Sequence, residues 1–290
     1  MEAYDYKLLS KFKMIVLIIV IFSIIVFCLW QNNSIIITES DYINSKIPEV
    51  FNNFKIAHIS DLHNKEFGKG QKNILRKLKS VAPDVIVITG DLIDRRRFNL
   101  DRAMTFVEGA VDIAPVFYVS GNHEAWSGKY ETIVHSLKDA GVHILDDDVM
   151  KLSIENSSIL RFGVKHPAFL TSSYMEGTAT SAMKEQLEKY CHYKGFKILL
   201  SHRPELFDLY CESNMNLIFT GHAHGGQFRI PFIGGLVAPD QGLFPKYTSG
   251  SYSKGISTMF VSRGLGNSII PIRIFNRPEV VVVTLKTKGE

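Results

Sequence analysis

Five segments of the sequence carry side chains that bind hard or borderline metal ions. In chain order they are Asp61-Leu62-His63, Gly90-Asp91-Leu92-Ile93-Asp94, Gly121-Asn122-His123-Glu124, His202 and Gly221-His222-Ala223-His224. Carboxylates, imidazoles and an amide oxygen, with no thiolate among them, suit Mn, Fe or Zn. These donors are too many for one tetrahedral ion, so we expect two divalent cations that share a carboxylate. Such pairs stand about 3.5–4 Å apart and clamp the attacking and leaving oxygens of a phosphoryl displacement.

Each of these segments directly follows a short apolar run. The runs cover residues 54–60, 84–89, 116–120, 196–200 and 217–220. They are continuous rather than alternating, which is typical of strands buried on both faces. Amphipathic stretches of helix length lie between them, at residues 69–80, 100–111 and 130–140, and this order predicts an α/β fold. Because open α/β sheets bind ligands beyond the carboxyl ends of their strands, we expect the five segments to meet in one crevice.

Two other regions are predicted to contain short strands, and the second of them shows no clear helix. Residues 150–164 predict a hairpin with its turn at 155–158, which could start a second sheet, and residues 225–286 are rich in predicted strands. The chain has 290 residues, of which 46% are apolar, and a formal net charge of +4. This composition argues against a disordered chain and against a protein that coats nucleic acid. Three cysteines are too few for a disulfide scaffold.

Residues 14–30 form an uncharged apolar stretch that predicts a membrane anchor. As a helix this stretch is roughly 25 Å long, just adequate for a bilayer core. The alternative is a cleaved signal peptide, which needs a shorter apolar stretch and small residues at the cleavage site. The stretch instead ends in the bulky Phe27-Cys28-Leu29-Trp30. We therefore expect a single-pass anchor at 14–30, a stalk at 31–53 and one catalytic domain at 54–290.

The charges beside the apolar stretch predict its orientation. Lys7, Lys11 and Lys13 precede it, whereas Lys46 is the nearest lysine that follows. The positive-inside rule places residues 1–13 in the cytoplasm and the catalytic domain outside the cytoplasmic membrane. In an oxidising compartment Cys191 and Cys211 could pair, and the sequence equally allows isolated thiols.

In this order, the five segments resemble the motifs of the calcineurin-like metallophosphoesterase superfamily, over residues 54 to the C-terminus. The anchor, the stretch from Gly221 to Gln227 and the tail motifs at 262–266 and 277–279 resemble its membrane-anchored bacterial branch. The resemblance implies a four-layer αββα sandwich of two mixed sheets. It also implies two divalent metal ions with a hydroxide between them as the nucleophile.

The resemblance assigns roles to individual residues. The first cation would be held by Asp61, His63, Asp91 and His224, and the second by Asp91, Asn122, His202 and His222. His123 would be the acid that protonates the leaving oxygen or would stabilise charge on the phosphorus oxygens, and Asp94 would orient its imidazole. Arg95 could bind a phosphate oxygen, although Arg95-Arg96-Arg97 could equally be a solvated basic turn. Gly163-Val164-Lys165-His166 lacks the acidic residue that relatives often carry there, which puts substrate positioning in doubt.

These observations predict a membrane-anchored hydrolase with two metal ions that cleaves phosphodiesters or pyrophosphates, whose substrate could be lipid-linked. One alternative is a pyrophosphatase of lipid-linked sugar nucleotides, with its domain in the cytoplasm. Another is a metallophosphoesterase scaffold that binds without catalysis. No nucleic-acid partner is predicted. Two further groups stay open: His166, whose loop could reach the crevice, and apolar residues that are either core or lipid-facing, namely Phe228, Phe232, Leu236, Leu243 and Phe244.

Overall fold

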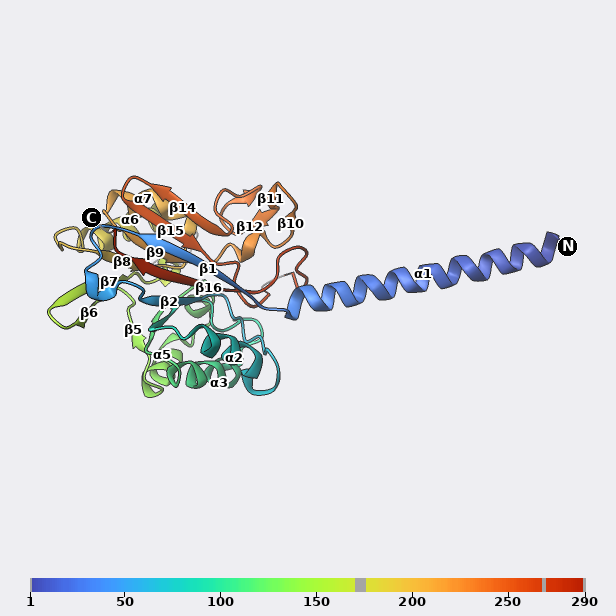
Figure 1. Ribbon diagram of the computed structural model, residues 1–290, viewed down its shortest axis with the longest axis horizontal. Coiled ribbons are helices and arrows are strands. Elements are labelled where there is room, and N and C mark those ends of the chain that lie inside the picture. The colour runs from blue at the N-terminus through green and yellow to red at the C-terminus, as the bar shows by residue number, and fades with distance from the viewer. Residues whose placement is uncertain (1, 170–175, 268–269, 289–290) are drawn as a thin grey trace.

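The computed structural model describes residues 2–169, 176–267 and 270–288. A long helix, α1 (Glu2–Asn33), projects from one end of a two-sheet domain (Figure 1). All three cysteines lie in the described residues and are free thiols, with Cys191 exposed and Cys211 half-buried.

Each sheet has six strands and mixes parallel with antiparallel pairs. The first sheet has the order β1 (Ile36–Ile43), β16 (Glu279–Lys286), β2 (Lys55–Ile59), β3 (Val85–Thr89), β4 (Val116–Val119) and β5 (His143–Ile144). The second has the order β14 (Gly250–Lys254), β15 (Ser257–Val261), β9 (Leu217–Thr220), β8 (Lys197–Leu200), β7 (Ser157–Gly163) and β6 (Val149–Ile154). Strands β2 to β5 are mutually parallel, as are β7, β8, β9 and β15.

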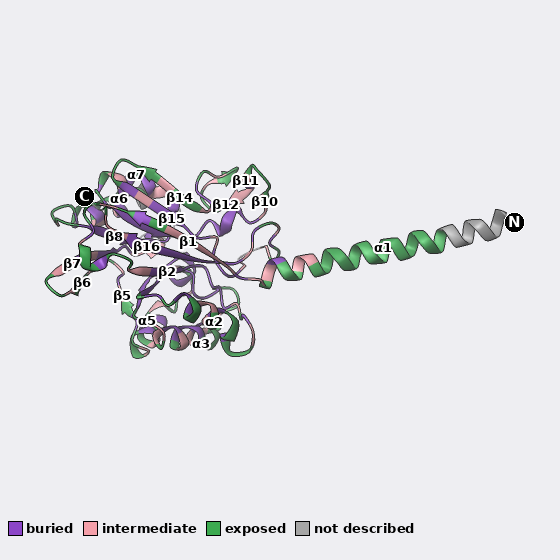
Figure 2. Ribbon diagram, viewed as in Figure 1, coloured by how far each residue is buried: buried purple, intermediate pink, exposed green. Residues whose placement is uncertain are grey.

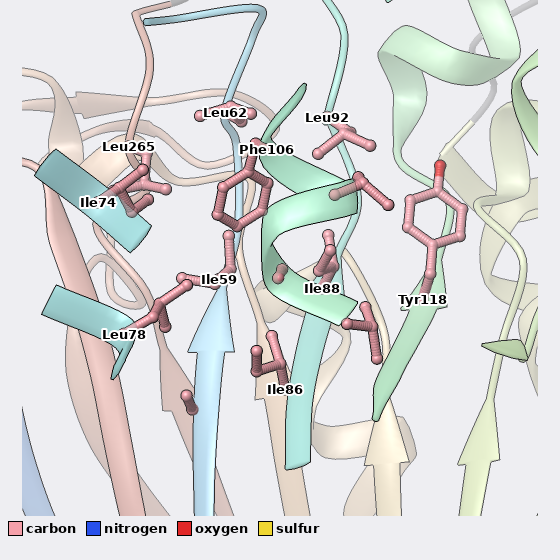
Figure 3. Close-up of a cluster of buried hydrophobic side chains, with 14 of the residues drawn as sticks. Ile59, Leu62, Ile74, Leu78, Ile86, Ile88, Leu92, Phe106, Tyr118 and Leu265 are labelled. Atoms are coloured by element: carbon pink, nitrogen blue, oxygen red, sulfur yellow. The ribbon is translucent and has the colours of Figure 1, made fainter. Parts of the chain in front are cut away.

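Helices cover the outer faces of both sheets. They are α2 (Lys72–Val81), α3 (Leu100–Val111) and α5 (Tyr130–Asp139) on the first sheet, and α6 (Glu176–Glu188) and α7 (Phe207–Glu212) on the second. In Figure 3, Leu78 and Phe106 from the helices pack against Ile59 and Ile88 from the strands. A second apolar layer, which includes Phe219, fills the space between the sheets. The predicted four-layer αββα sandwich is therefore confirmed.

Small elements complete the fold near the ends of the strands. They are α4 (Asn122–Trp126) and the short strands β10 (Arg229–Ile230), β11 (Gly234–Gly235), β12 (Val237–Ala238) and β13 (Gly242–Leu243). Strands β10 and β11 form one hairpin, and β12 and β13 form another.

The prediction of a stalk at residues 31–53 is wrong for much of that range. Strand β1 pairs in parallel with β16, from Ile36 opposite Glu279 to Ile43 opposite Lys286. Tyr42 and the following Phe51 are buried in the layer between the sheets. The sequence of β1 is polar because the strand lies at the edge of the sheet and most of its side chains are half-buried or exposed, so it resembles a linker.

The strand register places the end of α1 beside the carboxyl ends of the first-sheet strands. Ile36 lies opposite Glu279, and Val281 lies opposite His58 near the end of β2. Helix α1 ends only three residues before β1. Its segment Ser10–Asn33 has the length and apolar composition to cross a membrane. The most apolar 18 residues of this segment are not buried against the rest of the structure (Figure 2).

Candidate metal centre

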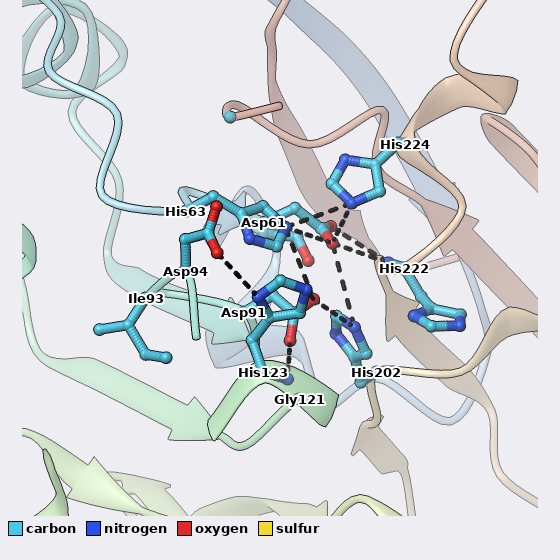
Figure 4. Close-up of polar contacts among 12 residues, drawn as sticks. Asp61, His63, Asp91, Ile93, Asp94, Gly121, His123, His202, His222 and His224 are labelled. Carbon is cyan, nitrogen blue, oxygen red and sulfur yellow. Dashed lines mark hydrogen bonds and ion pairs between the residues drawn. The ribbon is translucent and has the colours of Figure 1, made fainter. Parts of the chain in front are cut away.

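Six of the seven predicted ligands lie together where strands of the two sheets end (Figure 4), and the seventh, Asn122, directly follows Gly121, which contacts the Asp91 carboxylate. Asp61 and His63 follow β2, Asp91 follows β3 and Asn122 begins α4, while His202 follows β8 and both His222 and His224 follow β9. Each of the seven is buried. Parallel strands within each sheet bring their carboxyl ends to one edge, and the face-to-face packing of the sheets joins the two edges.

Four side chains form a first group that could hold a cation: Asp61, His63, Asp91 and His224. Nε2 of His63 lies 3.2 Å from Nε2 of His224 and 3.5 Å from Oδ2 of Asp91. Nε2 of His224 lies 3.4 Å from Oδ1 of Asp61. These atoms face one another with two nitrogens and two carboxylates, a donor set that suits a borderline divalent cation.

A second group shares Asp91 with the first and adds His202 and His222. Nε2 of His202 lies 3.4 Å from Oδ2 of Asp91, and its Nδ1 lies 2.6 Å from the carbonyl oxygen of Thr89. Nδ1–H donation to this carbonyl leaves Nε2 directed toward the carboxylates, where a cation would replace the proton that their field favours on this nitrogen. The Oδ1 atom of Asn122 is buried and has no hydrogen-bond partner. An unpartnered amide oxygen and an available imidazole nitrogen fit a second cation.

The backbone at the site is strained. Five of the seven residues have a positive φ, namely Asp61 (52°), His63 (47°), Asp91 (51°), His222 (65°) and His224 (47°). Left-handed conformations are uncommon for residues other than glycine and cluster at functional sites. Two neighbouring glycines permit close approach: a Cβ atom on Gly121 would overlap the Asp91 carboxylate, and one on Gly221 would overlap Ser60 and the Asp61 carboxylate.

The carboxylates create a strong negative field inside the site. Burial opposes protonation of His202, but Asp91 and Asp61 outweigh burial and raise the pKa of His202 to about 10. Burial alone favours the neutral form of Asp91, yet His202 and His123 hold the pKa of Asp91 well below its usual range. Burial lowers the pKa of His63 to about 3, so this imidazole is a neutral donor. A buried field of this sign stabilises cations.

His123 lies beside the candidate ligands, and its ring proton is on Nε2, the nitrogen that faces Asp91. Its Nδ1 accepts a hydrogen bond from the backbone N–H of Arg95 at 3.1 Å, so in the neutral ring the proton is on Nε2. Nε2 lies 4.0 Å from Oδ2 of Asp91. Burial lowers the pKa of His123, which favours this neutral form.

Asp94 contacts His123 less directly than the sequence suggested. Its Oδ1 lies 3.7 Å from Nδ1 of His123, beyond hydrogen-bond distance, and accepts the backbone N–H of Arg96 at 2.8 Å. Asp94 therefore orders the turn that presents the backbone N–H of Arg95. The guanidinium of Arg95 stacks over the Trp126 ring, 4.6 Å from its centroid.

Sequence reasoning missed Asp240. Its Oδ2 lies 2.7 Å from Nε2 of His222 and 3.2 Å from Nη2 of Arg203. Nothing in the local sequence of Asp240 marks it, because its position is defined by a histidine 18 residues away.

His166, whose role the sequence analysis left open, is buried beside the second group. Its ring centroid lies 5.6 Å from that of His202 and 6.1 Å from that of His222. The loop after β7 therefore does reach the site.

Comparisons with known proteins agree with this geometry. A family model described as calcineurin-like phosphoesterase matches residues 54–226. The chain is 32% identical over 257 residues to the uncharacterized metallophosphoesterase YkuE of Bacillus subtilis, a match that covers 86% of this chain and 85% of that protein. It is 26% identical over 243 residues to the phosphodiesterase YaeI of Escherichia coli, a match that covers 80% of this chain and 82% of that protein.

Among solved structures, the protein TT1561 of Thermus thermophilus has the same fold. The TM-score is 0.50 at 14% identity, and the match covers 73% of this chain and 89% of that chain. The chain therefore belongs to the calcineurin-like phosphoesterase family and is a metal-dependent hydrolase of phosphoesters.

Proposed function

We propose that this protein is a membrane-anchored phosphodiesterase with two divalent cations. The observation that carries the proposal is the position of Asp91, whose carboxylate belongs to both groups of candidate ligands. The first cation is assigned to Asp61, His63, Asp91 and His224, and the second to Asp91, Asn122, His202 and His222. When bound, the cations supply Lewis-acid polarisation of the phosphoryl oxygens and lower the pKa of a water.

In this proposal His123 is the hydrogen-bond donor that acts on the leaving oxygen. Its neutral ring holds a proton on Nε2, and that atom points at the ligand cluster while Nδ1 is occupied by Arg95 N–H. From this Nε2–H the ring donates a hydrogen bond to the leaving oxygen and stabilises the negative charge that develops on it. The neutral ring keeps its proton, because losing it would leave an imidazolate. Asp94 acts as a positioning residue through the turn that contains Arg95.

The substrate is an anion that enters beside His63. A cavity of about 640 Å³ opens there, and its lining includes two guanidiniums, of Arg97 and Arg102, and one carboxylate, of Glu66. Lys65 also lines it, but burial and the nearby Arg273 lower the pKa of Lys65 to about 7. The excess of positive charge favours a phosphate-containing ligand. The name of the relative YaeI supports a diester, and a pyrophosphate, which is an anhydride, is the second candidate because its hydrolysis also proceeds by attack at phosphorus.

The exposed apolar helix α1 supports anchoring in a membrane. Lys11 and Lys13 precede its apolar stretch, which favours a cytoplasmic N-terminus and a catalytic domain outside the cytoplasmic membrane. A C-terminal reporter fusion tests this orientation. We expect activity only from a reporter that functions outside the cytoplasm. Activity only from a cytoplasmic reporter would place the domain in the cytoplasm and favour the alternative of a lipid-linked sugar-nucleotide pyrophosphatase.

The activity is tested on the full chain in detergent after chelation and reloading with Mn, Fe, Zn or Co. We expect hydrolysis of a model diester to return with at least one of these ions. His123→Ala should reduce turnover about 10²–10⁴-fold while the bound metal is retained. Asp91→Asn should reduce bound metal and turnover together.

Two results would contradict the assignment of roles. Loss of metal from the His123→Ala variant would show that His123 is a ligand rather than a donor to the leaving oxygen. Full metal content and turnover in the Asp91→Asn variant would remove the shared carboxylate from the mechanism. The absence of turnover with all four ions would favour a scaffold without catalysis.

A further inference from the structure

Four large apolar side chains are exposed at the end of the domain from which α1 leaves. Ile230, Phe232 and Ile233 belong to the β10–β11 hairpin, and Phe275 belongs to the loop before β16; together we call them the apolar rim. Phe232 is fully exposed, Ile233 is 65% exposed and Phe275 is 53% exposed. The four line one shared hollow, so they form a continuous surface. Exposed apolar surface of this kind marks an interaction site.

The apolar rim is attached to the membrane helix. The ring of Phe275 packs against the ring of Phe27 in α1, with centroids 5.6 Å apart in an edge-to-face arrangement. The hairpin is joined to the same loop, because the backbone N–H of Arg229 donates to the carbonyl of Ile274 at 3.0 Å. Figure 1 shows the hairpin at the α1 end of the domain.

Polar contacts fix the base of α1 beside this loop. Arg277 stacks on Trp30 at 4.8 Å and donates from Nε to the carbonyl of Ser34 at 2.9 Å. Nδ2 of Asn267 donates to Oδ1 of Asn32 at 2.9 Å. The last turns of α1 are therefore held against the loop, and the depth of α1 sets the depth of the rim.

The contact with Phe27 sets that depth. At 1.5 Å per residue, Phe27 lies about 4.5 Å further along α1 than Trp30, toward the middle of the apolar stretch. Tryptophan and arginine side chains favour the level of the lipid headgroups. When Trp30 and Arg277 lie at that level, Phe27 lies at the start of the hydrocarbon, and so does the Phe275 ring that touches it.

We propose that the apolar rim inserts into the bilayer that α1 spans, so that the domain is docked onto the lipid surface rather than tethered above it. This inference rests on the proposed membrane anchoring of α1. The occupant of the rim is lipid, because the rim is continuous with a helix face exposed to the hydrocarbon. Since α1 enters the fold beside the carboxyl ends of the first-sheet strands, docking would hold the metal centre facing the headgroups.

The proposal is tested with the full chain in phosphatidylcholine nanodiscs whose acyl chains are brominated near the headgroup. Three variants each add one tryptophan: Ile21→Trp in α1, Ile233→Trp in the rim and Ile256→Trp as a matched control. Ile256 is an exposed isoleucine between β14 and β15, at the opposite end of the domain. The fluorescence of the tryptophans added at positions 21 and 233 should be quenched by the brominated lipid. The fluorescence of the tryptophan added at position 256 should be quenched by aqueous iodide.

The outcomes separate the two proposals. Quenching of the tryptophan at 21 by lipid, together with quenching at 233 by iodide alone, would overturn docking and leave the anchor intact. Quenching of both by iodide alone would overturn the anchor and docking together. Hydrolysis of a soluble model diester, measured in the same preparations, reports separately on the proposed chemistry and shows that each variant is folded.

Discussion

The imidazole of His222 is oriented by a carboxylate that no motif contains. Asp240 contacts Nε2 at 2.7 Å, and Arg203 holds the same carboxylate oxygen at 3.2 Å. With Nε2 engaged, Nδ1 is the nitrogen of His222 that remains for a cation. Carboxylates in such positions orient the ring and increase its basicity as a ligand.

We therefore expect Asp240→Asn to weaken cation binding at the second group by about 10–100-fold. The affinity can be measured by competition with a chromophoric chelator. The matched control is Asp208→Asn, which removes an exposed carboxylate that pairs with Lys254 at 2.7 Å. Equal affinities in the two variants would show that Asp240 does not orient His222.

Helix α4 joins two of the loops that carry ligands. The carboxylate of Glu124 in its first turn accepts backbone N–H groups from Gly121, Asp91, Leu92 and Ile93, at 2.8–3.2 Å. The loop after β3 and the loop after β4 are thus fixed to one side chain. Burial, together with the nearby Asp91, raises the pKa of Glu124 to about 7.

Glu124→Gln keeps the shape of the side chain and replaces one acceptor oxygen with a donor. At least one buried N–H then loses its partner, so we expect a stability loss of about 1–3 kcal/mol and a lower content of both cations. Unfolding curves and metal analysis measure these effects. Glu131→Gln, at an exposed position in the first turn of α5, is the control and should change neither quantity. Normal stability and metal content in the Glu124→Gln variant would show that Glu124 does not hold the two loops in place.

The whole domain has a pH-sensitive group between its two sheets. His58 on β2 is fully buried, with Nε2 2.8 Å from Oγ1 of Thr89 and its ring 5.1 Å from that of Phe219 in the other sheet. Burial lowers the pKa of His58 to about 3, whereas in the unfolded chain it is about 6.5. The unfolded state therefore binds this proton first, and the stability from neutral His58 is lost as pH falls from about 6.5 toward 3.

Between pH 7.5 and 5.0 this single group should remove about 2 kcal/mol from the free energy of unfolding. The His58→Gln variant should lack that part of the loss, while the metal ligands contribute equally to both proteins. Denaturant unfolding of the full chain in detergent, at the two pH values, gives the difference. Parallel losses in the two proteins would mean that His58 is protonated in the folded state.

The sequence by itself determined the α/β class, the central strands and which side chains gather at the candidate metal centre. Helix α3 has the predicted bounds, and α2 begins three residues later than predicted. These features follow from local sequence, because continuous apolar runs identify buried strands. The residues that directly follow parallel strands then lie at one edge of the sheet. The family resemblance supplied the four-layer arrangement that the residues alone did not.

Only the tertiary structure decided the features that depend on distant partners. Strand β1 is part of the sheet because Ile36 pairs with Glu279, and Asp240 contributes because it meets His222. Phe232, Leu243 and Phe244, which the sequence allowed as core, are exposed. Whether these side chains are buried depends on which surfaces the folded chain covers. Contacts between segments far apart in sequence decide this, and local composition does not encode such contacts.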